Sequence, residues 1–189
     1  MEYFGQLLTS CPRNESESLN HKNYKEWRLK ILSLEDSPMD AELIYEYLRE
    51  NFGTEIQMDI VLKEEEFVSA ISFKKYDLIL ADFMLTGFNG FTALSHVKSI
   101  CPSTPLICVS GFIGEETAVE LLKQGAIDYV SKDNLGRLKF SIERALKESK
   151  ENEEKEKRAA ELLIANKELA FQNEEKENEQ QSYLLPIKN

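Results

Sequence analysis

The chain has few cysteines, no long apolar run and no excess of positive charge. Its three cysteines, Cys11, Cys101 and Cys108, form no CxxC pair and no recognisable metal-ligand spacing, which argues against a disulfide scaffold and favours a reducing, cytoplasmic setting. The longest uncharged run, residues 99–114, contains two prolines and is shorter than the about 20 apolar residues of a membrane helix. The first residues do not resemble a signal peptide. We therefore expect no membrane insertion.

Positive charge is scarce along the whole sequence. The formal net charge is −11, and the longest basic stretch is KEKR at 155–158. A protein that binds nucleic acid through phosphates needs a basic surface, so we expect no direct nucleic-acid binding. The chain also lacks the GxxxxGK[ST] and GxGxxG motifs, which leaves nucleotide binding without support.

From Trp27 onward, short apolar runs alternate with segments of helical spacing, whereas residues 1–26 are polar and predict a flexible leader. Five strands are expected, at 29–34, 56–61, 78–81, 105–110 and 126–130. Ser37 and Pro38 predict the start of the first helix, with Asp40 as an acid in its first turn. Each gap holds one crossover helix, so the sequence predicts an α/β fold, a doubly wound parallel sheet with helices on both faces.

The end of the chain predicts one extended helix. After Gly136 there is no further glycine, and the remaining proline is Pro186, so a helix can begin near Leu135 and continue. Its first part closes a domain at 27–147. A charged helix, a coiled coil or linker, follows at 148–182, and a tail occupies 183–189.

A 21-residue repeat indicates how that charged helix is used. NEEKE occurs at 152–156 and again at 173–177, a spacing of three heptads. The short seam of the predicted coiled coil comprises Ala159, Leu162, Asn166 and Leu169. The alternative is a solvated single helix that does not self-associate.

Polar side chains follow the ends of four predicted strands. Glu35 and Asp36 follow the first strand, Asp82 the third, Ser110 ends the fourth, and Lys132 lies shortly after the fifth. Open α/β sheets bind ligands beyond the carboxyl ends of their strands. Two like charges about 4 Å apart repel by roughly 4 kcal/mol at a dielectric of about 20, so the three acids require positive partners. Lys132 supplies one charge, and an all-oxygen site suits Mg²⁺.

Four motifs around these residues resemble one family. They are LSLEDSPMDAELI, DLILADFMLTGFNGFTAL, PLICVSG and GAIDYVSKD, and in this order they resemble the receiver domain of bacterial two-component response regulators, a phosphorelay family, over about residues 27–147. The resemblance implies a flavodoxin-like sheet of order 2-1-3-4-5.

The resemblance implies a phosphoacceptor and a metal site. Asp82 would take a phosphoryl group from the phosphohistidine of a histidine kinase or phosphotransfer protein. Asp36, Asp82 and the backbone carbonyl of Met84 would bind Mg²⁺, while Glu35 would act mainly through water. Any catalysis by the module would be limited to its own phosphorylation and its own dephosphorylation.

The resemblance also implies a switch. Lys132 and Ser110 would bind phosphoryl oxygens, and Tyr129 matches the switch aromatic of the family. The signalling surface would comprise the fourth helix, the fifth strand and the fifth helix. The long helix would add a possible homodimer contact.

The sequence departs from the family pattern after two site residues. Thr86 and Asp133 stand where the family usually has proline, so the loop before Gly87 is expected to be less rigid. Two alternatives remain open at this stage. One is a fragment of a larger hybrid or receiver-linked sensor histidine kinase. The other is a Mg²⁺-dependent phosphatase that forms an aspartyl phosphate, although Met84 occupies the place of its usual second aspartate.

Overall fold

The computed structural model of the chain describes residues 28–53, 56–111 and 113–184. The predicted leader, residues 1–26, and residues 185–189 of the predicted tail lie outside these ranges.

Five short apolar runs form one parallel sheet in the order β2-β1-β3-β4-β5. The fold class and strand order predicted from the sequence are therefore confirmed. The strands are β1 (Leu29–Leu34), β2 (Ile56–Val61), β3 (Leu78–Ala81), β4 (Leu106–Ser110) and β5 (Asp128–Ser131). β3 and β4 are buried at every position, because helices cover both faces of the sheet there.

Helices connect the strands, as the spacing of apolar residues predicted. They are α1 (Pro38–Phe52), α2 (Glu64–Phe73), α3 (Gly90–Ile100), α4 (Glu115–Lys123) and α5 (Leu138–Leu184), with a 3-10 segment, η1 (Lys132–Arg137), before α5. The predicted cap of α1 is present, since the Ser37 side chain accepts a hydrogen bond from the Asp40 N–H. α5 begins three residues later than expected because residues 135–137 belong to η1, after the non-helical backbone of Asn134.

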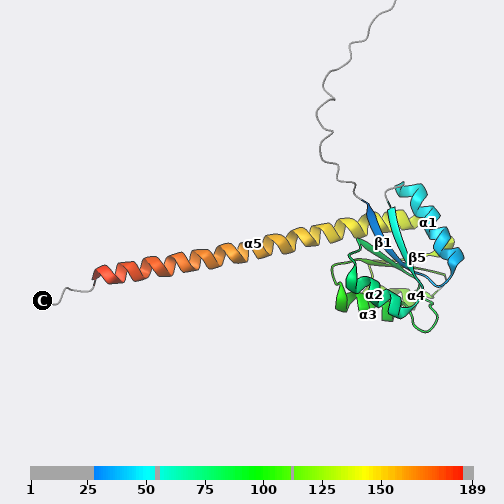
Figure 1. The fold of residues 1–189 in the computed structure, drawn as a ribbon, viewed down its shortest axis with the longest axis horizontal. Coiled ribbons are helices and arrows are strands. Elements are labelled where there is room, and N and C mark those ends of the chain that lie inside the picture. Colours follow the sequence, from blue (N-terminus) through cyan, green and yellow to red (C-terminus); the bar gives the residue numbers. More distant parts are fainter. Residues whose placement is uncertain (1–27, 54–55, 112, 185–189) are drawn as a thin grey trace, which may run out of the picture.

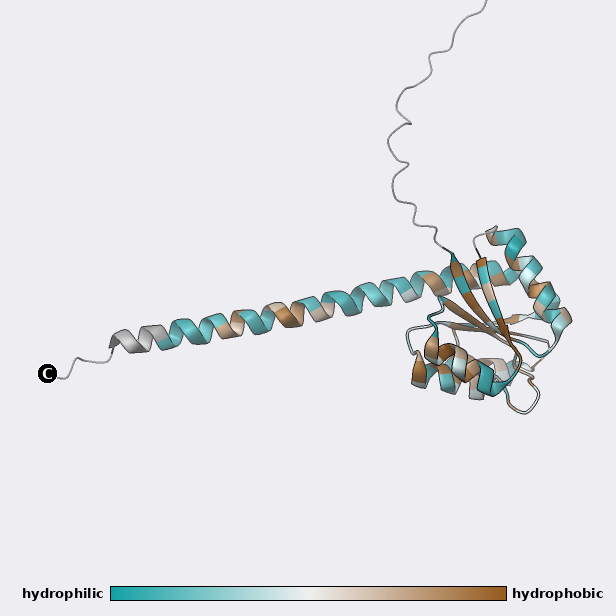
Figure 2. Ribbon diagram, in the orientation of Figure 1, coloured by the Kyte–Doolittle hydropathy of each residue, from teal (hydrophilic) through white to brown (hydrophobic). Residues whose placement is uncertain are grey.

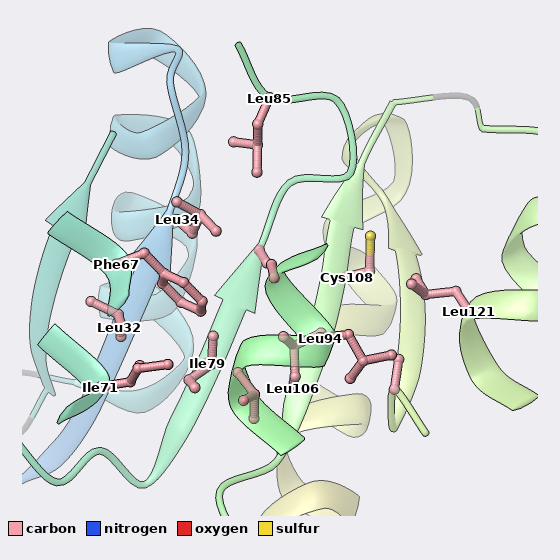
Figure 3. Close-up of a cluster of buried hydrophobic side chains, with 14 residues drawn as sticks. Leu32, Leu34, Phe67, Ile71, Ile79, Leu85, Leu94, Leu106, Cys108 and Leu121 are labelled. Atoms are coloured by element: carbon pink, nitrogen blue, oxygen red, sulfur yellow. The ribbon is translucent and has the colours of Figure 1, made fainter. Parts of the chain in front are cut away.

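Alternate residues of the strands build two cores, one on each face of the sheet. On one face, Leu32, Ile79 and Cys108 pack against α2, α3 and α4 (Figure 3). On the other face, Ile31 and Leu80 pack against α1 and the first turns of α5. Figure 1 shows the same division, with α1 and α5 on the opposite side of the sheet from α2, α3 and α4. This layering fixes the carboxyl ends of the strands at one edge.

Helix α5 has two parts of different character. Leu138, Ile142 and Ala145 are fully buried against the sheet, whereas residues 150–178 are exposed throughout. The exposed part projects away from the sheet (Figure 1) and is hydrophilic apart from an apolar stretch midway along it (Figure 2). Among the residues that the structure describes, no helix is long and apolar enough to cross a membrane.

Candidate functional site

The ends of β1 and β3 bring three carboxylates together. Leu34 and Ala81 are register partners, and the Asp82 N–H donates to the Leu34 carbonyl at 2.9 Å. The next residues along β1, Glu35 and Asp36, therefore lie beside Asp82. One oxygen from each of these three side chains falls in a cluster whose atoms are all within 4.8 Å of one another. Glu35 is 1% exposed and Asp82 is 7% exposed. Because these carboxylates are buried and close to one another, they need a positive charge nearby.

Lys132, the first residue of η1, provides that positive charge. Its Nζ lies 2.8 Å from Glu35 Oε2, 2.7 Å from Asp82 Oδ2 and 2.6 Å from Asp40 Oδ2. Burial by itself lowers the pKa of Lys132, but the contacts with the carboxylates of Asp40, Asp82 and Glu35 outweigh it and raise that pKa above its usual range. The lysine is therefore a permanent cation among four acidic side chains.

Asp40 belongs to this site, and the sequence analysis identified it only as an acid in the first turn of α1. Its carboxylate makes the shortest of the three contacts to Lys132. The spacing in the sequence could have suggested this role. Asp40 follows Asp36 by four residues and α1 begins between them, so both acids lie at the same end of one helix. The partner of Asp40 lies 92 residues away, a distance in sequence that spacing does not resolve.

Asp82 uses both of its oxygens. Oδ2 contacts Lys132, while Oδ1 accepts hydrogen bonds from the Ser110 hydroxyl and from the Met84 N–H, the latter at 3.1 Å. The predicted residues Asp82, Ser110 and Lys132 therefore meet at one carboxylate. Met84 meets it through its backbone N–H, and an isolated bridge with Asn89 holds the same loop.

Asp36 is held by the loop after β3. Its Oδ2 accepts the Thr86 N–H at 2.9 Å and the Thr86 hydroxyl at 2.7 Å. The hydroxyl, with the backbone N–H, lowers the pKa of Asp36. Proline, the usual family residue at this position, offers neither donor. The departure at Thr86 thus adds two hydrogen bonds to a loop that the sequence alone predicted to be less rigid.

Glu35 is the most deeply buried acid of the cluster. Its Oε1 accepts the Ser37 N–H at 3.2 Å, whereas its buried Oε2 makes no hydrogen bond, although Lys132 lies near it as an ion-pair partner. Burial raises the pKa of Glu35, and Lys132 opposes this only in part. A buried carboxylate oxygen without a hydrogen bond, in an all-oxygen cluster, fits the ligands that Mg²⁺ prefers.

Tyr129 lies beside this cluster and is connected to it through β4. It pairs in register with Cys108, and its hydroxyl donates to the carbonyl of Gly111, the residue after Ser110. Burial raises the pKa of the Tyr129 phenol, so the hydroxyl remains a donor. Burial also raises the pKa of Cys108 to about 12, so this thiol is not a nucleophile at neutral pH.

Comparison with known proteins identifies the family. The family model of the response regulator receiver domain matches residues 31–143, more than half of the chain. The chain therefore belongs to the response regulator receiver domain family, as its motifs suggested.

Individual relatives agree with this assignment. The transcriptional regulatory protein ZraR of Salmonella typhimurium is 28% identical over 125 residues, which are 66% of this chain and 28% of that regulator. The chain thus spans less than a third of the length of this relative. A receiver domain of a Francisella response regulator has a TM-score of 0.57 at 25% identity, over 65% of this chain and 99% of that one. The receiver domain of a sensor histidine kinase from Pseudomonas aeruginosa shares the fold, with a TM-score of 0.52 at 22% identity, over 63% of this chain and 98% of that one.

Proposed function

We propose that the chain is a phosphoacceptor module in which Asp82 takes a phosphoryl group from the phosphohistidine of a histidine kinase or phosphotransfer protein. The observation that supports this most directly is the position of Asp82, buried at the sheet edge between Lys132 and the Ser110 hydroxyl. In the transfer, a carboxylate oxygen of Asp82 forms a bond to phosphorus while the phosphorus–nitrogen bond breaks. The histidine nitrogen keeps the electron pair, and an acyl phosphate results.

We propose that Glu35, Asp36, Asp82 and the backbone carbonyl of Met84 form a Mg²⁺ site, with Glu35 acting mainly through water. The three-carboxylate cluster and the oxygen of Glu35 that makes no hydrogen bond support this proposal. The related Pseudomonas aeruginosa receiver domain has a magnesium ion coordinated in its active site cleft. When bound, the cation neutralises charge that develops on the transferred phosphoryl group.

Lys132, Ser110 and Tyr129 are proposed to convert phosphorylation into a change of surface. Lys132 and Ser110 would donate to phosphoryl oxygens, so the Ser110 hydroxyl must leave the Asp82 oxygen that it now contacts. Movement of Ser110 displaces Gly111, whose carbonyl accepts the Tyr129 hydroxyl. The signal would then reach α4, β5 and α5, a local charge change that biases a two-state surface.

The long helix is proposed to be a coiled coil that holds two copies together. Leu162 and Leu169, which belong to the predicted seam, are 65% and 56% exposed in the single chain, so their apolar surface is available to a second helix. In this proposal residues 27–147 are the receiver unit and 148–182 the connecting helix. The same helix suits the alternative of a connector in a larger sensor histidine kinase. We place the module in the cytoplasm and assign it no direct contact with nucleic acid.

A Mg²⁺-dependent phosphatase of the aspartyl-phosphate type is the alternative from another class. Such an enzyme needs a second acid two residues after its nucleophile. In this chain Met84 stands there and contributes its backbone N–H to Asp82. Asp40 contacts the same lysine as the proposed acceptor, and this ion pair holds it away from the role of a general acid.

Labelling with acetyl phosphate and Mg²⁺ tests the proposed acceptor. The unsubstituted protein should gain the mass of one phosphoryl group, and Asp82→Asn should gain none. Asp133→Asn is a matched control, because Asp133 is exposed and follows Lys132 directly, and it should be labelled like the unsubstituted protein. Labelling that persists in Asp82→Asn would remove Asp82 as the acceptor.

A further inference from the structure

Asp40 uses one of the three N–H donors of Lys132. An ammonium group has three N–H bonds and no lone pair. In this structure three carboxylate oxygens, from Glu35, Asp40 and Asp82, lie 2.8, 2.6 and 2.7 Å from Nζ. Before any phosphoryl group arrives, Lys132 therefore already donates hydrogen bonds to Asp40 and Asp82, and Glu35 lies beside it as a third anionic partner.

The three partners of Lys132 differ in how easily they can be released. The Glu35 side chain is 1% exposed and the Asp82 side chain 8% exposed, whereas the Asp40 side chain is 37% exposed. Asp40 lies in the first turn of α1, so its carboxylate can turn toward water without leaving a buried charge behind. Separating Asp40 from Lys132 therefore costs less free energy than separating Glu35 or Asp82, because either of those would remain as an unpaired buried charge.

We propose that Asp40 is a positioning residue that restrains Lys132 in the unphosphorylated protein and slows the entry of a phosphoryl group. This inference depends on the proposed phosphoacceptor function. Asp40 restrains the site in two ways that act in the same direction: it occupies a donor that a phosphoryl oxygen needs, and its negative charge repels the incoming anion.

The test compares three variants of the full chain at saturating Mg²⁺. Asp40→Asn removes the charge at nearly constant shape, and Asp40→Glu keeps the charge on a longer side chain. Glu42→Gln is the matched control. Glu42 is exposed on the same helix, and its substitution removes one negative charge that does not contact Lys132. Circular dichroism and urea unfolding confirm that each variant folds.

Asp40→Asn should be labelled by acetyl phosphate about two- to five-fold faster than the unsubstituted protein, the scale of a partly exposed ion pair. Asp40→Glu should return the rate toward that of the unsubstituted protein, and Glu42→Gln should leave it unchanged. An unchanged or slower rate in Asp40→Asn, with normal labelling of the unsubstituted protein, would overturn the role of Asp40. An equal acceleration in Glu42→Gln would also overturn it, because general charge would then explain the effect.

A second readout does not depend on phosphorylation. In the metal-free protein the ¹⁵N ammonium signal of Lys132 should show slow exchange with water, and Asp40→Asn should accelerate that exchange. Equal exchange in both proteins would show that Asp40 does not hold the lysine, and would refute the inference whatever the labelling rates. Absence of labelling in the unsubstituted protein would refute the proposed function itself and, with it, the restraint on phosphoryl entry.

Discussion

Thr86 donates both its backbone N–H and its hydroxyl to a single oxygen of Asp36, at 2.9 and 2.7 Å. The loop after β3 is thereby fastened to the residues after β1, across the acid cluster. Proline, which the family pattern predicts at this position, could make neither contact because it has no N–H and no hydroxyl.

Replacing Thr86 by valine should raise the pKa of Asp36 toward its ordinary value of 3.8. The hydroxyl is the main cause of the lowered pKa, and valine removes it while keeping the N–H. Titration of the Asp36 carboxyl carbon by NMR measures the change. Ser99→Ala, which removes an exposed hydroxyl bonded within α3, is the control. An unmoved Asp36 pKa in Thr86→Val would contradict the assigned cause.

The free energy of unfolding should depend on pH because Glu35 is buried. Its pKa is raised in the folded state, so the unfolded chain releases the proton first as the pH rises above 4.5. The stability that a protonated Glu35 provides is therefore complete below pH 4.5 and is lost as the pH rises through the folded-state pKa. Glu35→Gln cannot ionise, so it should gain stability relative to the unsubstituted protein over that rise.

Urea unfolding at several pH values, with and without Mg²⁺, measures this difference. A cation bound at Glu35 favours the ionised form, so Mg²⁺ should reduce the pH-dependent gap between the two proteins. A gap that stays constant from acid to neutral pH would show that Glu35 does not titrate as its burial implies.

Removing the Lys132 charge should destabilise the fold. Lys132→Met leaves Glu35 and Asp82 buried without their cation, and breaking a buried ion pair in this way costs about 3 kcal/mol. Urea unfolding in the absence of Mg²⁺ measures the loss. Lys150→Met, which changes an exposed lysine of α5, should have little effect. A Lys132→Met midpoint equal to that of the unsubstituted protein would mean that the acids are relieved in another way.

Self-association should depend on the seam of the long helix. Changing Leu162 and Leu169 together to serine should convert a dimer into a monomer in light scattering. Ile164 and Phe171 are also exposed, but they lie on the opposite side of α5 from the seam. Changing these two residues to serine should leave a two-stranded dimer intact. Loss of association in both double variants would instead indicate a bundle of more than two helices.

The sequence predicted the fold and most of the site because both follow from local patterns. Buried parallel strands have uninterrupted apolar runs, and the residue that ends each run lies at a known edge of the sheet. Glu35, Asp82, Ser110 and Lys132 could be placed together for this reason. The class of fold required only the alternation of strands and helices.

The contacts of Asp40 and Thr86 could not be predicted in the same way. Asp40 had a sufficient local explanation as an acid in a helix first turn, and Thr86 was judged by what it replaces rather than by what it donates. Each makes its contact with a residue at least 50 positions away. Such pairings depend on loop geometry and side-chain rotamers, which periodicity and strand ends do not specify.

Because α5 is one continuous helix, a small movement at its buried end produces a larger displacement at its far end. One helix begins among the buried side chains of Leu138 and Ile142 and extends, without a glycine or proline, to Leu184. At about 1.5 Å per residue, the part of the helix from Lys150 to Leu184 is roughly 50 Å long. A tilt of about 5° at the buried end therefore moves the far tip by roughly 4 Å over that length, so a rearrangement too small to disturb the sheet becomes a displacement the size of a side chain.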